Sequence, residues 1–301
     1  MAAARRALAF FRSFGRGDEI VALVSGGASS LLCLPRKGWT LTEKRARIAA
    51  AMRAGWPIER LNRLRISLSA IKGGRLAAAT RARVTTLVLS DVPGGEPRLV
   101  GSGPTIGRRR GDSFHLLADN RTGLEAAALA ARVSGTTVRI EARVLAGEAR
   151  EAGRAFARRL RALADRETGE SFLLAGGETT VALGSRPGTG GRNQEFALAA
   201  ALEIAGDDRL SLFCAGSDGI DGNSGNAGAR VDGRTIRSGA RRGAAADACL
   251  DRNDSAAFFE RAGGAFRPGP TGTNVADWVF GRVAPVAAGT GRDRGAAARG
   301  N

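Results

Sequence analysis

The stretch VALVSGGASSLL, residues 21–32, decides the fold class of this 301-residue chain. It continues the apolar run EIVALV, which stops in serines and glycines before an apolar segment resumes. A buried strand that passes through a glycine-rich turn into a helix is the repeating unit of an α/β protein. Such a turn also holds anions, because its backbone N–H groups and the following helix N-terminus carry partial positive charge. A tight turn without a ligand fits the same residues, which match neither the P-loop nor the G-x-G-x-x-G motif.

The same pattern recurs along the chain. The apolar runs RVTTLVLS (83–90), ESFLLA (170–175) and RLSLFCA (209–215) each lead into a glycine-rich loop. Short apolar runs without alternation are typical of strands buried on both faces, as in parallel sheets. Helical patterns predict an amphipathic N-terminal helix and further helices at 40–54, 58–71, 122–134, 147–166, 193–205 and 253–262. The alternation of strands and helices predicts an α/β chain with open sheets.

Two local signals refine this pattern. Thr40 and Glu43 predict a capping box at the start of the helix at 40–54. The segment DRETGE separates a long arginine-rich helical pattern from the next strand, which predicts a boundary near 167–170. We therefore predict a first domain at 1–168, a second at 169–284, and a disordered tail at 285–301, where complexity and apolar content fall.

Composition excludes several classes of protein. The formal charge is +17, but only three lysines are present, the arginines are scattered along helical stretches, and aromatic residues are 5%. This pattern disfavours nucleic-acid binding and favours acidic small molecules as ligands. The sequence contains no run of about 18 apolar residues, so it predicts no membrane span. With a single histidine, the chain does not fit a zinc hydrolase. Three widely spaced cysteines indicate reduced thiols in a cytoplasmic protein.

Several loops carry residues suited to anion or phosphoryl chemistry. Asp91 follows a predicted strand, where a carboxylate meets Mg²⁺ or a substrate hydroxyl. Asp218 and Asp221 lie in GSDGIDG and fit either a shared cation or simple turn formation. Lys72 precedes a Gly-Gly break, and Arg192 precedes a helix that Asn193 or a neighbour caps, with Glu195 in its first turn. Phosphoryl transfer needs such positioning and charge neutralisation more than a reactive nucleophile.

The loops form an ordered set that resembles a known family. The motifs LVSGGASSLLCLP, NRLRISLSAIKGGRLA, LVLSDVPGGEP, GSGPT, LLADNRTGLEAAALA, LLAGGETTVAL, GGRNQEFALAAAL, AGSDGIDG, NDSAAFFERAGG and GPTGTNVADW occur in this order. They are similar to those of the type II glycerate kinases, the glycerate 2-kinase family, whose members have often been labelled hydroxypyruvate reductases. The resemblance covers about 18 to 282. It implies ATP- and Mg²⁺-dependent phosphorylation of D-glycerate to 2-phosphoglycerate.

The resemblance also implies a fold and a site. The expected fold is a Rossmann-like three-layer αβα domain, lacking its usual N-terminal part, followed by a smaller α/β domain, with the active site in the cleft between them. The implied catalytic residues are Arg192, Lys72 and Asp91, and the implied metal ligands are Asp91 and Asp218. Substrate would be bound by Ser25, Gly26, Gly27, Ser29 and Arg65. The nucleotide would be bound by Gly176, Gly177, Glu178, Asn193, Glu195, Asp218, Thr271, Thr273 and Asn274.

The chain departs from the family pattern in ways that keep alternatives open. No segment matches the family's portion before the SGG strand, which includes a lysine thought to be catalytic, so impaired activity is one expectation. The alternatives are an NAD(P)H-dependent hydroxypyruvate reductase, which should show a G-x-G-x-x-G turn after a strand, and an inactive ligand-binding paralogue. A small-molecule substrate is the expected partner, with no nucleic acid and no membrane, and a homodimer is left open.

Overall fold

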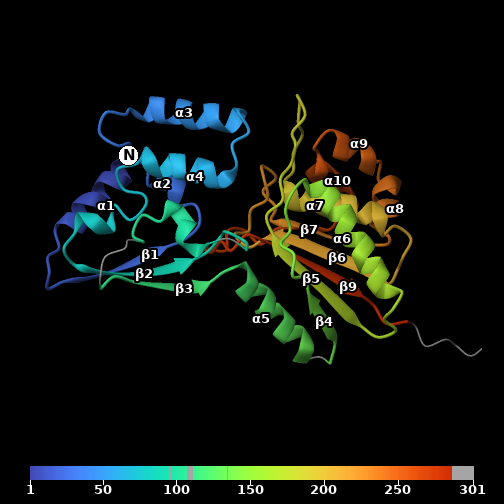
Figure 1. The fold of residues 1–301 in the computed structure, drawn as a ribbon. Helices are drawn as coiled ribbons and strands as arrows, with labels where there is room; N and C mark the ends of the chain where they lie inside the picture. Colours follow the sequence, from blue (N-terminus) through green and yellow to red (C-terminus); the bar gives the residue numbers. More distant parts are fainter. Residues whose placement is uncertain (95, 107–110, 134, 287–301) are drawn as a thin grey trace, which may run out of the picture.

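The strands form two separate sheets. The structure is a computed structural model that describes residues 1–94, 96–106, 111–133 and 135–286. One sheet has three strands in the order β1-β2-β3, and the other has six in the order β4-β5-β9-β6-β7-β8. Figure 1 shows the first sheet beneath helices α1 to α4 and the second sheet packed against α6 and α7. The α/β class and the arrangement in two units are as expected from the sequence.

The first sheet is parallel, as the apolar runs predicted. Its strands are β1 (Glu19–Val24), β2 (Arg83–Leu89) and β3 (Ser113–Ala118). The helices of this unit are α1 (Ala2–Arg12), α2 (Ala28–Leu31), α3 (Leu41–Arg53) and α4 (Ile58–Ser67), with 3₁₀ turns η1 (Ala77–Ala79) and η2 (Pro97–Ser102).

Only one face of this sheet is covered by helices in the described part of the chain. Ile20 and Val84 pack under α1 and η1, whereas Val21 and Leu23 on the opposite face are 59% and 77% exposed. The sequence predicted strands buried on both faces in a three-layer unit. The first sheet instead has two layers, with one face covered by helices and the other exposed. Alternate residues of a strand point to opposite faces, so a strand without a second helical layer leaves half its apolar residues in solvent.

The second sheet is mixed rather than parallel. Its strands are β4 (Thr137–Ile140), β5 (Ser171–Gly177), β6 (Leu210–Gly216), β7 (Gly228–Asp232), β8 (Ala265–Phe266) and β9 (Asp277–Val283). β4 and β5 are parallel, but β9 lies between β5 and β6 and is antiparallel to both. The expectation of a parallel environment for the strand at 209–215 is wrong, because the last strand of the described chain returns into the centre of the sheet.

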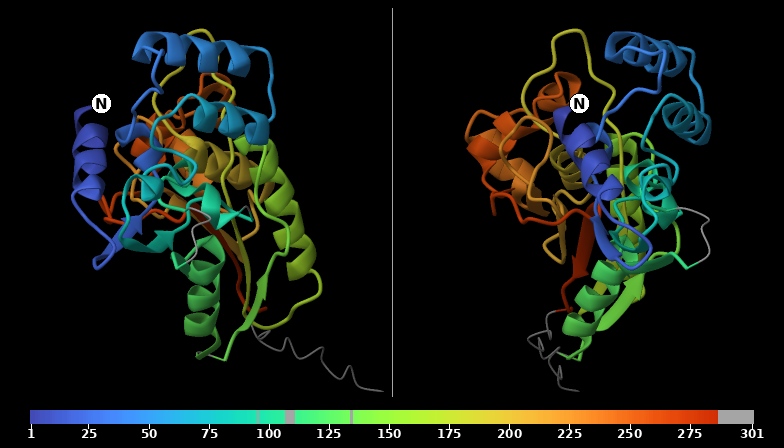
Figure 2. Two further views of the ribbon diagram at one scale, coloured as in Figure 1. Left: turned by 60° about the vertical axis from the view of Figure 1, so that its left-hand side comes forward. Right: turned by 90° about the vertical axis from the view of Figure 1, so that its left-hand side faces the viewer.

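Helices cover both faces of the second sheet. On one face, α5 (Asn120–Val133) packs through Leu124 and Ala128 against β4, β5 and β9. The other face carries α6 (Ala149–Ala164), α7 (Arg192–Glu203), α8 (Thr235–Arg241), α9 (Ala246–Asp251) and α10 (Ser255–Ala262), which share one apolar core with the strands. The two turned views in Figure 2 place α3 and α5 at opposite ends of the molecule. Three layers are therefore found in the second unit.

The sheets do not divide where the sequence suggested. β4, α5 and α6 precede residue 168, yet β4 is a strand of the six-stranded sheet and the two helices pack against that sheet. The second unit is therefore the larger one. The short strand β4 lacks the long apolar run by which the other strands were predicted. Its sequence therefore did not indicate that it pairs with β5. The predicted tail falls largely on 287–301, outside the described residues.

Local predictions of helices hold well. The N-terminal helix forms, and the Thr40–Glu43 capping box has both of its reciprocal hydrogen bonds. The helix predicted at 58–71 ends at Ser67, because Arg75 donates to the carbonyls of Ile66 and Ser69 and stabilises the turn that follows. No helix in the described ranges is long and apolar enough to cross a membrane.

Candidate active site at the junction of the two units

The site is built on one edge of the second sheet. Asp277, the first residue of β9, lies in register with Gly177 at the end of β5 and Gly216 at the end of β6. Because β9 runs antiparallel, its beginning meets the ends of its two neighbours. The residues that follow, Glu178 and Asp218, therefore emerge at the same edge, as ligand-binding loops do in open α/β sheets.

Arg192 lies across this edge at the start of α7. Its Nε and Nη2 donate to the two carboxylate oxygens of Asp277 at 2.5 and 3.0 Å, and Nη1 lies 3.1 Å from Glu178 Oε1. Burial opposes the charge, but the bonds to Asp277 and the nearby carboxylates raise the pKa of Arg192. Burial raises the pKa of Glu178; Arg192 lowers it, and the charges of Asp277, Asp91 and Asp218 raise it further. The edge thus presents a fixed cation among several carboxylates.

The N-terminus of α7 is capped from another loop. Asp221 accepts hydrogen bonds from the backbone N–H groups of Asn193 and Gln194 at 2.9 and 2.8 Å. Of the predicted caps, Asn193 or a neighbour, Asn193 is not the one: its side chain is buried, its Oδ1 accepts from Cys214 Sγ, and the neighbouring Gly191 is the N-cap residue. Burial raises the pKa of Asp221 to about 6, although the two backbone bonds oppose this. The anion at this helix N-terminus is therefore the protein's own carboxylate.

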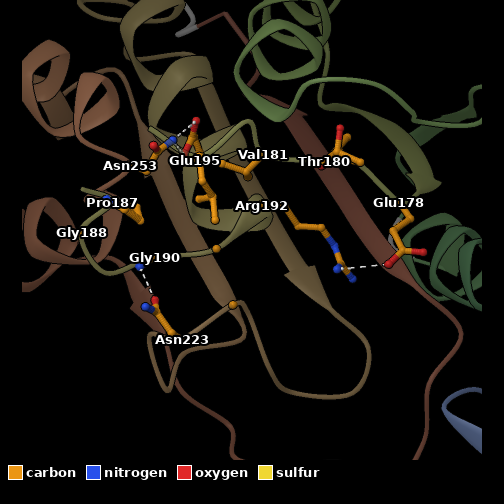
Figure 3. Close-up of a pocket in the computed structure, with 14 residues that line it drawn as sticks. Glu178, Thr180, Val181, Pro187, Gly188, Gly190, Arg192, Glu195, Asn223 and Asn253 are labelled. Atoms are coloured by element: carbon orange, nitrogen blue, oxygen red, sulfur yellow. Dashed lines mark hydrogen bonds and ion pairs between the residues drawn. The ribbon is translucent and has the colours of Figure 1, made fainter. Parts of the chain in front are cut away.

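A cleft of about 640 Å³ opens beside Arg192. Figure 3 shows its lining, which comes from the long loop after β5, the start of α7, the 222–223 turn and Asn253. Glu195 lines the cleft but is 2% exposed; Arg150 donates to it at 2.6 Å, and Asn253 Nδ2 also bonds to it. Its carboxylate thus anchors the wall of the cleft, and Asn253 also holds the loop through Ala182 and Gly184.

Two neighbouring loops hold the remaining predicted residues of this unit. Asp218 Oδ1 accepts from the Ile220 N–H, and Asp218 O accepts from the Thr271 N–H, so this aspartate forms its own turn. Thr271 donates to Ser217 O and accepts from the Thr273 N–H. Asn274 Oδ1 accepts from the Ala276 N–H. These side chains shape the loops, and Gly176 leaves room for Asn120 of α5.

In the first unit, Lys72 is 4% exposed and donates to Ser29 and Ser102. Burial, and then the positive charges of Lys44 and Arg65, lower the pKa of Lys72 to about 8. Lys44 is equally buried, with its Nζ 3.7 Å from Cys33 Sγ. The side chains of Lys72, Lys44 and Arg65 form hydrogen bonds with hydroxyl groups, a thiol and an amide oxygen. A group of cations held by such neutral partners is suited to an anionic ligand.

The SGG loop that opened the sequence analysis contacts Asp91. The Gly27 N–H donates to the Asp91 carboxylate, and a Cβ on Gly26 would lie 2.2 Å from Asp91 Oδ2, so only glycine allows this approach. Burial raises the pKa of Asp91. The backbone cradle predicted for a substrate anion is therefore shared with an internal carboxylate. Ser25 at the start of the loop is exposed.

Asp91 is also the link between the two groups of predicted residues. Its charge acts on Glu178 across the junction, while its loop packs Gly94 against Val144 of the second unit. Asp91 thus connects to the first unit through the SGG loop, whose Ser29 accepts from Lys72, and to the second unit through Glu178, which pairs with Arg192. Among the described residues, no three His, Cys, Asp or Glu side chains are grouped closely enough to hold a metal by themselves.

Several residues of the site were missed by reasoning from the sequence. They are Asp277, Asn253, Lys44 and Ser102, which act through partners far away in the chain. Asp277 lay within the quoted motif GPTGTNVADW, but nothing local indicated its bond with Arg192, 85 positions earlier. The cap by Asp221 was missed for the same reason.

Comparisons with known proteins identify the family to which this chain belongs. Residues 1–133 match a domain of unknown function (DUF4147), and residues 171–277 match the MOFRL family. A D-glycerate 2-kinase of Thermotoga maritima is 34% identical, over 93% of this chain and 76% of that protein. The chain belongs to the glycerate kinase type II family. A putative hydroxypyruvate reductase of Agrobacterium vitis is 37% identical, over 91% of this chain and 72% of that protein.

Solved structures of the family agree with the fold. The crystal structure of a glycerate kinase from Thermotoga maritima matches with a TM-score of 0.85 at 32% identity, over 94% of this chain and 77% of that one. A Pyrococcus horikoshii protein matches with a TM-score of 0.76 at 28% identity, over 94% and 75%. The resemblance seen in the ordered motifs is confirmed.

Proposed function

We propose that the chain is a glycerate 2-kinase, which transfers the terminal phosphoryl group of ATP to the 2-hydroxyl of D-glycerate. The observation that carries this is Arg192, a guanidinium fixed by Asp277 at the mouth of a large cleft. Its remaining edge forms an ion pair with the half-exposed Glu178, so a phosphate can replace that contact. A fixed cation of this kind stabilises charge developing on a transferred phosphoryl group.

The cleft of the second unit is the proposed ATP site. Its volume of about 640 Å³ falls in the range of small-molecule sites. Val181, Leu183 and Pro187 give it an apolar wall, and Arg192 lies at the end nearest the first unit. The nucleotide would therefore lie with its base against the loop after β5 and its phosphates toward Arg192.

The cations of the first unit are the proposed glycerate site. Lys72, beside Ser29 and near Arg65, provides the charge that a carboxylate needs. The SGG loop and Asp91 lie between this group and Glu178. Glycerate bound here would have its hydroxyl toward the phosphates.

Asp91 and Asp218 are the residues proposed to hold Mg²⁺. Both charges act on Glu178, so the carboxylates share one region, and one or two carboxylates with substrate phosphates commonly complete a magnesium site. The absence of a closed three-ligand cluster in the described residues fits this arrangement. When bound, the ion would neutralise phosphate charge. A cytoplasmic location remains part of the proposal, in keeping with three free cysteines.

The test is to identify the product. The purified chain, ATP, MgCl₂ and D-glycerate should release ADP and form 2-phosphoglycerate, which enolase alone converts to phosphoenolpyruvate; 3-phosphoglycerate would need a mutase as well. L-Glycerate and Arg192→Lys serve as controls. NADH oxidation with hydroxypyruvate would support the reductase instead. Calorimetric binding of ATP with no product would support a ligand-binding paralogue.

A further inference from the structure

Asp277 is placed so that it can act only through another residue. Its side chain is 5% exposed, which leaves little of it for a ligand to touch. Its backbone is fixed as well: it pairs with both neighbouring strands, and its carbonyl accepts from Asn120 Nδ2 at 3.0 Å. The carboxylate is thus a rigid group at the edge of the sheet.

The contact with Arg192 is made along one side of the guanidinium. Both carboxylate oxygens accept, one from Nε and one from Nη2, which fixes the plane of the group as well as its position. The opposite end, Nη1, faces Glu178, whose side chain is 50% exposed. Two carboxylates therefore play different roles: the buried one orients the cation, and the exposed one can exchange with a ligand.

We propose that Asp277 is a positioning residue for phosphoryl transfer, which holds the Arg192 guanidinium in the plane from which Nη1 and Nη2 meet the transferred group. This inference rests on the proposed function. Stabilisation of a transition state requires donors that are already oriented, so an arginine free to rotate would still attract ATP but would accelerate the reaction less. A merely structural ion pair would instead affect stability and leave catalysis intact.

Kinetics of Asp277→Asn separate these roles. The amide keeps the shape but loses the charge and one acceptor. We expect kcat to fall by about a hundredfold while KM for ATP changes by less than about threefold. In Arg192→Lys, which cannot form the side-on pair, adding Asp277→Asn should cost nothing further in kcat. Losses that multiply in the double variant would overturn the proposal, because Asp277 would then act independently of Arg192.

A matched control uses another ion pair made by strand β9. Arg282 of β9 and Glu170, just before β5, form an exposed ion pair at 2.6 Å at the far end of the sheet. Glu170→Gln removes a carboxylate–arginine contact of the same strand β9 without approaching the cleft. Its kcat should equal that of the unchanged protein. A loss as large as that of Asp277→Asn would show that strand pairing, rather than orientation of Arg192, matters.

A measurement without turnover separates this inference from the proposed function. In protein with ¹⁵N-labelled arginine, the Arg192 Nε–H resonance, assigned by its loss in Arg192→Lys, should exchange slowly with water. In Asp277→Asn it should exchange at the rate of a free arginine, and in Asp277→Glu it should regain part of its protection. An unchanged resonance in Asp277→Asn would overturn the positioning role, even in a chain that phosphorylates no glycerate. If Asp277→Asn does not fold, the unchanged protein alone gives the test: fast exchange of its Arg192 Nε–H with water would overturn the positioning role.

Discussion

Replacing Asp221 with asparagine isolates the cost of a buried charge at the start of α7. The carboxylate is 1% exposed and accepts from the Asn193 and Gln194 N–H groups. Asparagine retains one acceptor of similar shape and carries no charge. The comparison therefore removes the ionisation of this site while keeping a partial cap.

The size of the effect follows from the shifted pKa. Burial raises the pKa of Asp221 from 3.8 to about 6, so the folded chain binds a proton more tightly than the unfolded chain does. This contribution to stability is complete below about pH 4 and is lost as pH rises through 6. Two pKa units correspond to about 3 kcal/mol, of which about 1 kcal/mol is lost between pH 5 and 7. The asparagine variant lacks this loss.

The assay is urea unfolding of both proteins at several pH values from 5 to 8. The free energy of unfolding of Asp221→Asn, minus that of the unchanged chain, should rise by about 1 kcal/mol between pH 5 and 7 and then level off. Asp221→Ala, which leaves two buried N–H groups without an acceptor, should be less stable than Asp221→Asn throughout. A difference that stays constant with pH, or that falls, would refute the reasoning.

Three further changes test other parts of the structure. Lys72→Met should abolish glycerate phosphorylation; in the unchanged chain KM for glycerate should rise above pH 8 as Lys72 loses its proton, and Lys72→Arg should shift that rise to higher pH in a pH–rate profile. Gly153→Ala, which improves helix propensity, should nonetheless destabilise the chain by about 1–3 kcal/mol in urea, because the new Cβ would lie 2.3 Å from Phe196 O. Thr40→Ala should lower the free energy of unfolding by about 1 kcal/mol through loss of the capping box.

Each of these has a control and a result that contradicts it. If KM for glycerate rises at the same alkaline pH in Lys72→Arg as in the unchanged chain, a group other than Lys72 must titrate there. Gly169→Ala, where a Cβ meets nothing within 4 Å, controls for the substitution itself, and stabilisation by Gly153→Ala would disprove the close packing of α6 on α7. Thr42→Ala, at an exposed position in the first turn of the same helix, should change stability less than Thr40→Ala, and equal losses would argue against the cap.

Local features of the fold could be predicted because local residues determine them. The capping box at Thr40 and the apolar run at 19–24 need no knowledge of the rest of the chain. The order of strands in the second sheet could not be predicted in this way. β9 inserts between β5 and β6 through pairings that span more than 60 residues, and no short pattern encodes such a partner.

The candidate site shows the same division. The sequence identified Lys72 because lysine is nearly absent from the chain, and Arg192 because it stands between a glycine-rich loop and a helix. Family resemblance placed both in an ordered set of motifs. It did not identify what holds them. Asp277 and Asp221 contribute to the site through contacts with residues 85 and 28 positions away, so their roles appear only once the chain is folded.

The uncovered face of the first sheet bears on how cooperatively the chain unfolds. Val21 and Leu23 remain largely in solvent, and each fully buried side chain of this kind would contribute about 1.5–3 kcal/mol. The second sheet buries both faces, so its core is the more strongly protected. We expect a denaturant to melt the first sheet before the second, with Trp39 and Trp56 reporting an earlier transition than Trp278. The two halves of the proposed active site would then differ in thermodynamic stability, and a ligand that bridges them would bring the two transitions together.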